Sequence, residues 1–295
     1  MKSSPTTNFY IMHRPFIGYF LYTMLAVWCL FYERNYLRST NAFCFICGLA
    51  KINLKNFKIE YMKYMGSKAR IAKEILPIIL KDRKPEQWYV EPFCGGSNLI
   101  ENVDGNRIAN DINYCLIEFS KALQNGWMPP KEISEEMFNE IKMQPNDYEP
   151  CLVGYVGFQL TYGAMWMGSY RRDNEGKRNY SHEAYNNVKK QAPKLKDIRY
   201  LNTEYYKIEM PENSLIYCDP PYKDTAKYKA NETVFDYDLF YNWCRNLTKQ
   251  GHTVFISEYQ MPDDFICIWE KRICSSLGKN TGAKKATEKL FTLMA

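Results

Sequence analysis

A short apolar run in this chain ends in an acid, two prolines and a tyrosine. The run covers residues 215–218, and Asp219, Pro220, Pro221 and Tyr222 follow it directly. The run predicts a buried strand, and ligands bind at the carboxyl ends of strands in open α/β sheets. Two successive prolines fix φ and remove two backbone donors, which leaves rigid carbonyl acceptors. Asp219 adds a carboxylate acceptor, and Tyr222 adds a flat ring on which a base could stack.

This set of groups suits a planar aromatic amine. An exocyclic NH2 is a poor nucleophile because its lone pair is delocalised into the ring. Acceptors on both N–H groups would draw the nitrogen toward tetrahedral geometry and free the lone pair to attack a sulfonium methyl group. We therefore predict direct transfer, with Asp219, Pro220, Pro221 and Tyr222 as the catalytic set. The alternative is a plain turn, since Asp-Pro and Pro-Pro are common in loops.

A glycine turn upstream provides a second candidate site. Residues 91–97 contain the adjacent Gly95 and Gly96 and follow the apolar residues 88–90. Glycines there let the backbone approach a ligand closely, although a structural turn explains two glycines equally well. Asp111 favours a ligand, because an acid at the end of the next strand can accept hydrogen bonds from ribose hydroxyls. The full G-x-G-x-x-G pattern is absent, which disfavours a dinucleotide.

The elements that must position these residues alternate between strands and helices from Gly66 onward. Strands are expected at residues 88–90, 107–110, 200–202, 215–218, 253–257, 265–269 and 289–293. Helices are expected at residues 68–80, kinked by Pro77, and at 113–124, 131–143 and 236–249. This alternation predicts an α/β fold with a largely parallel sheet and helices on both faces.

Residues 127–198 interrupt the alternation and indicate an inserted lobe. Between Tyr170 and Tyr200 there are nine Lys/Arg and four Asp/Glu, a local net charge of +5, with aromatic residues interleaved. Basic side chains can contact phosphates, and aromatic or arginine side chains can fill the gap left by a flipped base. We predict contacts with double-stranded DNA from Arg171, Arg172, Lys177, Arg178 and Tyr170. The alternative is a solvated surface whose aromatic side chains pack inward.

The order of these motifs resembles that of the Dam-type adenine-specific DNA methyltransferases, particularly the phage and restriction–modification members. The resemblance covers about residues 62–295 and rests on residues 64–68, 91–96, 110–113 and 219–222. It implies a Rossmann-like methyltransferase sheet with an inserted, mainly helical DNA-recognition lobe. It also implies S-adenosyl-L-methionine as the cofactor and adenine N6 as the methyl acceptor at a specific DNA site.

The resemblance also implies roles for single residues. Tyr64 and Lys68 would contact the cofactor, although many members carry Trp at the position of Tyr64. The other cofactor residues would be Phe93 and Gly95 on the methionine side, Asp111 at the ribose, Tyr205 beside the cofactor adenine, and Asp219. Residues 219–222 would hold a flipped adenine.

Motif order predicts the domain organisation. The glycine turn precedes the Asp-Pro-Pro-Tyr motif, and the lobe lies between them. The catalytic domain is therefore expected at residues 62–126 and 199–295, with the target-recognition lobe at 127–198. Two alternatives remain: an RNA-base or protein-glutamine amine methyltransferase on the same fold, and a non-catalytic DNA-binding protein on a decayed methylase fold.

The first 61 residues differ from the remainder. They carry a net charge of +5. Residues 16–32 contain no charged side chain, and the length of this stretch is at the short limit for a membrane-spanning helix. We interpret residues 1–61 as an N-terminal extension translated from an early start codon, with a membrane anchor or a buried helix as the alternatives. Met62 then opens the soluble domain.

Composition limits the remaining function classes. Ten scattered cysteines and three distant histidines favour a reducing cytoplasm and predict no metal site, although Cys44 and Cys47 form one C-x-x-C pair. A cytoplasmic monomer or weak dimer is expected, with a cognate restriction endonuclease as a further partner.

Overall fold

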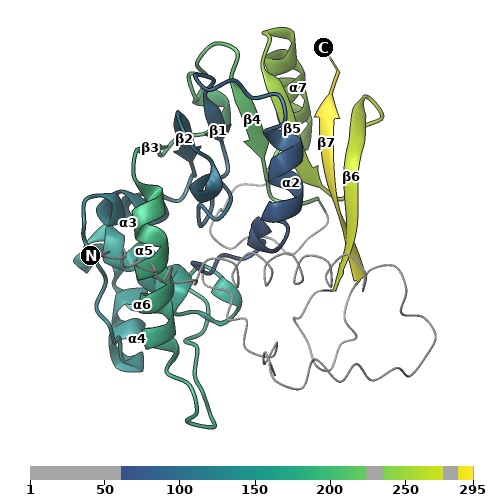
Figure 1. Cartoon of the computed structure of the whole chain (residues 1–295). Coiled ribbons are helices and arrows are strands. Elements are labelled where there is room, and N and C mark those ends of the chain that lie inside the picture. The colour runs from purple at the N-terminus through teal and green to yellow at the C-terminus, as the bar shows by residue number, and fades with distance from the viewer. Residues whose placement is uncertain (1–60, 224–234, 275–284, 295) are drawn as a thin grey trace, which may run out of the picture. The chain divides into compact units, whose positions relative to one another are not determined.

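The computed structural model describes residues 61–223, 235–274 and 285–294 (Figure 1). The expected extension up to residue 60, the apolar residues 16–32 and the Cys44–Cys47 pair lie outside this part of the chain. None of the helices within the described ranges has the length and apolar character needed to cross a membrane.

Seven strands form one sheet. They are β1 (Tyr89–Glu91), β2 (Arg107–Asn110), β3 (Ile198–Leu201), β4 (Leu215–Cys218), β5 (Thr253–Glu258), β6 (Phe265–Cys274) and β7 (Lys285–Leu293). Their order is β3-β2-β1-β4-β5-β7-β6. Strands β1 to β5 pair with one another in parallel, whereas β7 pairs antiparallel with both β5 and β6. This topology confirms the predicted Rossmann-like α/β class.

Six helices accompany the sheet in the described residues. They are α2 (Ala72–Ile79), α3 (Tyr114–Gln124), α4 (Glu135–Met143), α5 (Pro150–Gln159), α6 (Tyr180–Gln191) and α7 (Tyr237–Lys249). Helices α3 and α7 begin where the sequence places a capping side chain. Asn113 accepts a hydrogen bond from the Leu116 amide, and Asp236 accepts one from the Leu239 amide. Such caps satisfy amides that have no partner within the helix.

Alternating side chains of the strands face two separate helical layers. In β4, Leu215 and Tyr217 join the cluster that contains α2 and α3, whereas Ile216 and Cys218 join the cluster that contains α7. A strand buried on both faces must be apolar throughout, as these four residues are. Figure 1 shows α2 and α7 flanking the same central strands.

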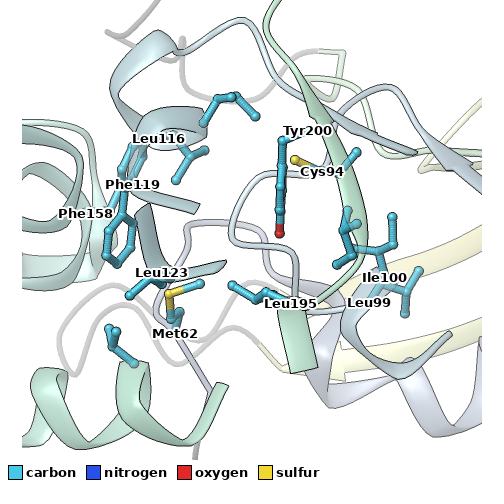
Figure 2. Packing of buried hydrophobic residues seen from close by; sticks show 14 of the residues in the cluster. Met62, Cys94, Leu99, Ile100, Leu116, Phe119, Leu123, Phe158, Leu195 and Tyr200 are labelled. Carbon is cyan, nitrogen blue, oxygen red and sulfur yellow. The ribbon is translucent and has the colours of Figure 1, made fainter. Parts of the chain in front are cut away.

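The inserted lobe shares its core with the sheet domain. Helices α4, α5 and α6 gather at the side of the sheet where β3 lies (Figure 1). Helix α5 approaches α3 so closely that a Cβ on Gly154 would lie 2.2 Å from the Cys115 carbonyl oxygen. Figure 2 shows Phe119 of α3 and Phe158 of α5 in the same cluster as Tyr200 of β3 and Cys94. The lobe helices are therefore held rigidly by the catalytic core.

Two features differ from the sequence-based expectations. Helix α6 lies in a polar stretch of the lobe for which no helix bounds were predicted, because only Ala184, Val188 and a few other side chains on one face are buried. Strands β6 and β7 form a hairpin longer than expected, since the exposed residues 270–272 continue the pairing without an apolar pattern.

Candidate active site

The two sequence motifs meet at the carboxyl ends of neighbouring strands. Strand β1 pairs in parallel with β4, and Val90 lies opposite Ile216. The glycine turn follows β1, and the Asp219–Tyr222 segment follows β4. The order of strands reverses between β1 and β4, and such a switch point opens a ligand site in open α/β sheets. The fold thus joins groups that are more than a hundred residues apart in the chain.

Asp219 forms an ion pair with a lysine from the start of the domain. Lys68 Nζ lies 2.9 Å from Asp219 Oδ1 and donates to the Gly66 carbonyl at 2.9 Å. The Lys68 side chain is buried, whereas that of Asp219 is 20% exposed, which leaves it open to a substrate. Burial raises the pKa of Asp219 to about 6, although Lys68 opposes this shift. Burial alone would lower the pKa of Lys68, but Asp219 and Glu288 raise it.

The ring of Tyr222 is held on several sides. Its hydroxyl donates to Glu288 Oε2 at 2.8 Å, and its ring meets Tyr259 edge-on with centroids 4.7 Å apart. Lys68 Nζ lies 4.7 Å from the ring centroid, within the range of a cation–π contact. Burial raises the pKa of Tyr222 well above its ordinary value, so the hydroxyl is a proton donor at neutral pH.

Two further contacts fix the backbone of this segment. The Tyr237 hydroxyl donates to the Pro221 carbonyl at 3.1 Å. The Lys223 amide donates to Glu258 Oε1 at 2.6 Å, and the Tyr259 amide donates to the other oxygen of the same carboxylate. The Pro221 carbonyl therefore does not point outward as a free acceptor, contrary to the expectation from the sequence, because it already accepts a hydrogen bond from within the protein.

Asp111 organises the glycine turn. Its carboxylate accepts hydrogen bonds from the Gly95 amide at 3.1 Å and the Asn113 amide at 2.9 Å. Burial raises the pKa of Asp111 to about 6, and these amides limit the rise. Tyr64 packs against the turn so closely that a Cβ on Gly95, whose φ is +47°, would lie 2.5 Å from the ring. Tyr64, Gly95 and Asp111 thus form one unit, and their contacts with a cofactor stay predictions.

An aromatic cluster lies on the other side of the turn. Phe93 and Tyr205 have ring centroids 5.1 Å apart, and Phe240 of α7 contacts both. Asn110 ties this region together, because its side-chain amide donates to the carbonyls of Pro92 and Thr203, each at 3.0 Å. Phe93 and Tyr205 are therefore neighbours, although more than a hundred residues separate them in the sequence.

The residues present fit S-adenosylmethionine. Asp111 offers carboxylate oxygens suited to ribose hydroxyls, and Tyr205 offers an aromatic ring for the cofactor adenine. Phe93 packs on Tyr205, and its place on the methionine side stays a prediction. The Tyr205 hydroxyl is buried and has no hydrogen-bond partner among the described residues. A buried polar group without a partner costs about 1–3 kcal/mol, which a hydrogen bond to a bound ligand would offset.

The predicted DNA-contacting residues lie apart from this cluster, on the lobe. Three of the cations pair with acids: Arg172 with Glu135, Lys177 with Glu175 and Arg178 with Glu183.

Arg171 and Tyr170 behave differently from these three cations. The Arg171 guanidinium stacks on the Tyr180 ring, 3.7 Å from its centroid, and its Nη1 has no hydrogen-bond partner among the described residues. Tyr170 packs on Phe138 and donates to the Ile133 carbonyl at 2.8 Å, which is a packing role in the lobe.

Several site residues were missed by sequence reasoning. Glu258, Glu288 and Tyr237 hold the Asp219–Tyr222 segment, and Gln191 of α6 donates to the Gly96 carbonyl at 2.9 Å. Only Glu258 carried a signal, since it is an acid at the end of an apolar strand. No group of three or more metal-ligating side chains gathers in the described ranges.

The chain is similar to known adenine-specific DNA methyltransferases. Residues 64–159 match the model of the D12 class N6 adenine-specific DNA methyltransferases. The type II methyltransferase M.MjaIII of Methanocaldococcus jannaschii is 22% identical over 282 residues, which cover 79% of this chain and 97% of that protein. A DNA adenine methylase of Vibrio cholerae is 24% identical over 182 residues, which cover 55% of this chain and 64% of that protein.

Solved structures were compared as well. A protein described as a class I S-adenosylmethionine-dependent methyltransferase from Listeria monocytogenes aligns over 81% of this chain and 62% of its own, with 10% identity and a TM-score of 0.36. A second methyltransferase, in complex with SAH, covers 81% of this chain and 55% of its own, with 12% identity and a TM-score of 0.35. The family model over residues 64–159, the methylase relatives and the junction of the two motifs agree: the chain is similar to the D12 class of N6 adenine-specific DNA methyltransferases, and S-adenosylmethionine is the methyl donor that this similarity supports.

Proposed function

We propose that the chain methylates N6 of an adenine flipped out of double-stranded DNA, at a specific sequence. The observation that carries this proposal is the position of Asp219, partly exposed, paired with Lys68 and beside the glycine turn. Asp219 and the Pro220 carbonyl would accept the two N–H groups of the adenine amine. Tyr222 would present its ring to the base.

The chemical step needs only positioning and charge. S-adenosylmethionine supplies an electrophilic methyl group on a sulfonium. The N6 lone pair forms the new N–C bond while the S–C bond breaks, and the surplus N6 proton leaves toward the acceptors at Asp219. A positioned acceptor in a site shielded from water contributes more than the same group in water.

Lys68 maintains the charge on Asp219. A carboxyl group with a pKa near 6 is partly protonated just below neutral pH, and a protonated oxygen is a poorer acceptor. The nearby ammonium favours the ionised form. This role adds to the cofactor contact that the resemblance implies for Lys68, and both remain proposals.

Tyr162 is our candidate for the side chain that replaces the flipped base. Tyr162 is 63% exposed, more than any other aromatic residue described in the lobe. The loop that carries it is closed by its own amide, which donates to the Ser169 carbonyl at 2.9 Å. Trp166 anchors the loop, packing on Phe158 with ring centroids 4.8 Å apart. An exposed ring on an anchored loop suits insertion between bases.

Phosphate contacts would come from Arg171 and, after exchange of their acidic partners, from Arg172, Lys177 and Arg178. A cognate restriction endonuclease stays a prediction from the resemblance. The predicted oligomeric state, a monomer or weak dimer, stays a prediction as well.

The test uses the full-length protein, methyl-labelled S-adenosylmethionine and unmethylated duplex DNA. We expect label in N6-methyladenine at one sequence, which sequencing of the product would map. An Asp219→Ala protein gives the background. Label in RNA or protein but not in DNA, despite cofactor binding, would replace this proposal with the amine-methyltransferase alternative.

A further inference from the structure

Glu288 is a buried acid that reaches the proposed adenine site from the far end of the chain. It lies on β7, only 7% exposed, and β7 pairs with β5 so that Glu258 is opposite Lys289. Its carboxylate accepts the Tyr222 hydroxyl at 2.8 Å. Burying a carboxylate is costly unless it is hydrogen-bonded, so this contact must be maintained by the surrounding structure.

The Tyr222 hydroxyl has one proton and two carboxylates within its reach. It donates to Glu288 and also interacts with Asp219. Burial raises the pKa of Asp219, whereas Lys68 and the Tyr222 hydroxyl favour its charged form. A phenol donates a single hydrogen bond. If Glu288 did not accept that proton, the hydroxyl would be free to turn to Asp219 and occupy an acceptor site there.

The ring of Tyr222 also has an aromatic and a cationic neighbour. Tyr259 meets the ring edge-on, and Lys68 lies over it. Such aromatic and cation–π contacts each contribute about 0.5–1.5 kcal/mol and fix the orientation of a ring only loosely. A hydrogen bond to a buried carboxylate is stronger and more directional.

We propose that Glu288 is a positioning residue, which takes the Tyr222 hydroxyl proton and so sets the ring against the base and leaves Asp219 free to accept the adenine amine. The inference rests on the proposed function, because it assumes that Tyr222 and Asp219 face the adenine. Glu288 acts through Tyr222 and touches neither substrate. Its effect therefore depends on the reach of its side chain more than on its charge.

Two conservative variants separate reach from charge. Glu288→Gln keeps the length and one carbonyl acceptor but removes the charge. Glu288→Asp keeps the charge but withdraws it by one methylene. We expect E288Q to remain within about threefold of the wild-type kcat/KM for unmethylated DNA, and E288D to lose about 10- to 50-fold, since loss of a hydrogen bond to a charged group has this size.

The same proteins should bind S-adenosylmethionine with unchanged Kd in calorimetry, because Glu288 has no described contact with the glycine turn. In a Tyr222→Phe background the hydroxyl is absent, so E288D should cause no further loss. The inference is overturned if E288Q falls as far as E288D, or if E288D costs the same with and without the hydroxyl.

Crystal structures of E288Q and E288D make the result independent of turnover. The ring of Tyr222 should keep its place in E288Q and move in E288D. A ring that stays in place in E288D refutes the positioning role even if the protein proves to methylate another substrate. Failure of the proposed function would appear differently, as wild-type protein that leaves DNA unlabelled.

Discussion

The Asp219–Tyr222 segment and the basic loop of the lobe use charged side chains in opposite ways. At the Asp219–Tyr222 segment the charges are buried or partly buried, and each has a partner from a distant part of the chain, as Lys68 has for Asp219. On the lobe the cations are mostly exposed, and their acidic partners lie on the same surface, as Glu183 does for Arg178.

The proposed function accounts for this difference. An amine must be held at fixed acceptors during the reaction, so the acceptors are oriented before the substrate arrives. DNA phosphates would replace ion pairs on a solvated surface, where an exposed pair is worth about 0–1 kcal/mol and can be exchanged at little cost. The experiments below test this difference between the two regions, beginning with the largest expected effect.

Asp219→Ala should reduce kcat by about 10³-fold or more, the scale of losing a principal electrostatic contact in a transition state. DNA affinity should stay within about threefold, because the proposed phosphate contacts lie on the lobe. Single-turnover kinetics and gel-shift titration measure the two quantities. Asp263→Ala, which removes an exposed acid, is the matched control. Retained turnover in the Asp219 variant would refute its role.

Asp111→Asn should weaken S-adenosylmethionine binding by about 10- to 100-fold, as expected for loss of a charged acceptor that also holds the glycine turn. Calorimetry measures this Kd, and the DNA Kd should be unchanged. Asp104→Asn, at an exposed turn before β2, serves as control. Equal loss of DNA binding would indicate general unfolding in place of a cofactor role.

Lys68→Met should move the acid limb of the pH–rate profile upward. The reaction needs ionised Asp219, so kcat/KM falls as the pH drops through about 6, the pKa of this carboxyl. Lys68 lowers that pKa, and its removal therefore raises it, which shifts the limb to higher pH. Lys121→Met removes a surface lysine paired with Glu118 and should leave the profile unchanged. If the acid limb of the pH–rate profile does not move in the Lys68 variant, Lys68 does not control the pKa of Asp219.

Arg171→Ala should weaken DNA binding more than Arg172→Ala, because Arg172 must first leave Glu135. Each lost phosphate contact should reduce the slope of log K against log salt by about 0.9. Filter binding over a range of salt measures the slopes, with Lys249→Ala on α7 as control. A double variant with the wild-type slope would remove this surface from the DNA interface.

The catalytic and cofactor roles could be proposed from the sequence because each motif is local. An apolar run followed by Asp-Pro-Pro-Tyr, and an acid at the end of the next strand, indicate their positions without reference to the remainder of the chain. The same local patterns gave β2 and β4 with their observed bounds. Amphipathic spacing and capping residues located α3 and α7 to within one residue.

Partners from elsewhere in the chain could not be predicted in this way. Glu288 lies in a polar strand with no chemical motif, and it becomes part of the site only because β7 inserts between β5 and β6. The packing role of Tyr170 was hidden for the same reason, since its partner Phe138 belongs to another helix.

The sequence by itself determined the chemistry of this protein, because the types and order of the motif residues restrict the reaction to transfer onto an amine. Only the tertiary structure decided which groups hold the catalytic acceptors and which cations are engaged by acids. Those contacts depend on strand order and helix packing, and residues far apart in the chain leave no local pattern from which their proximity could be read.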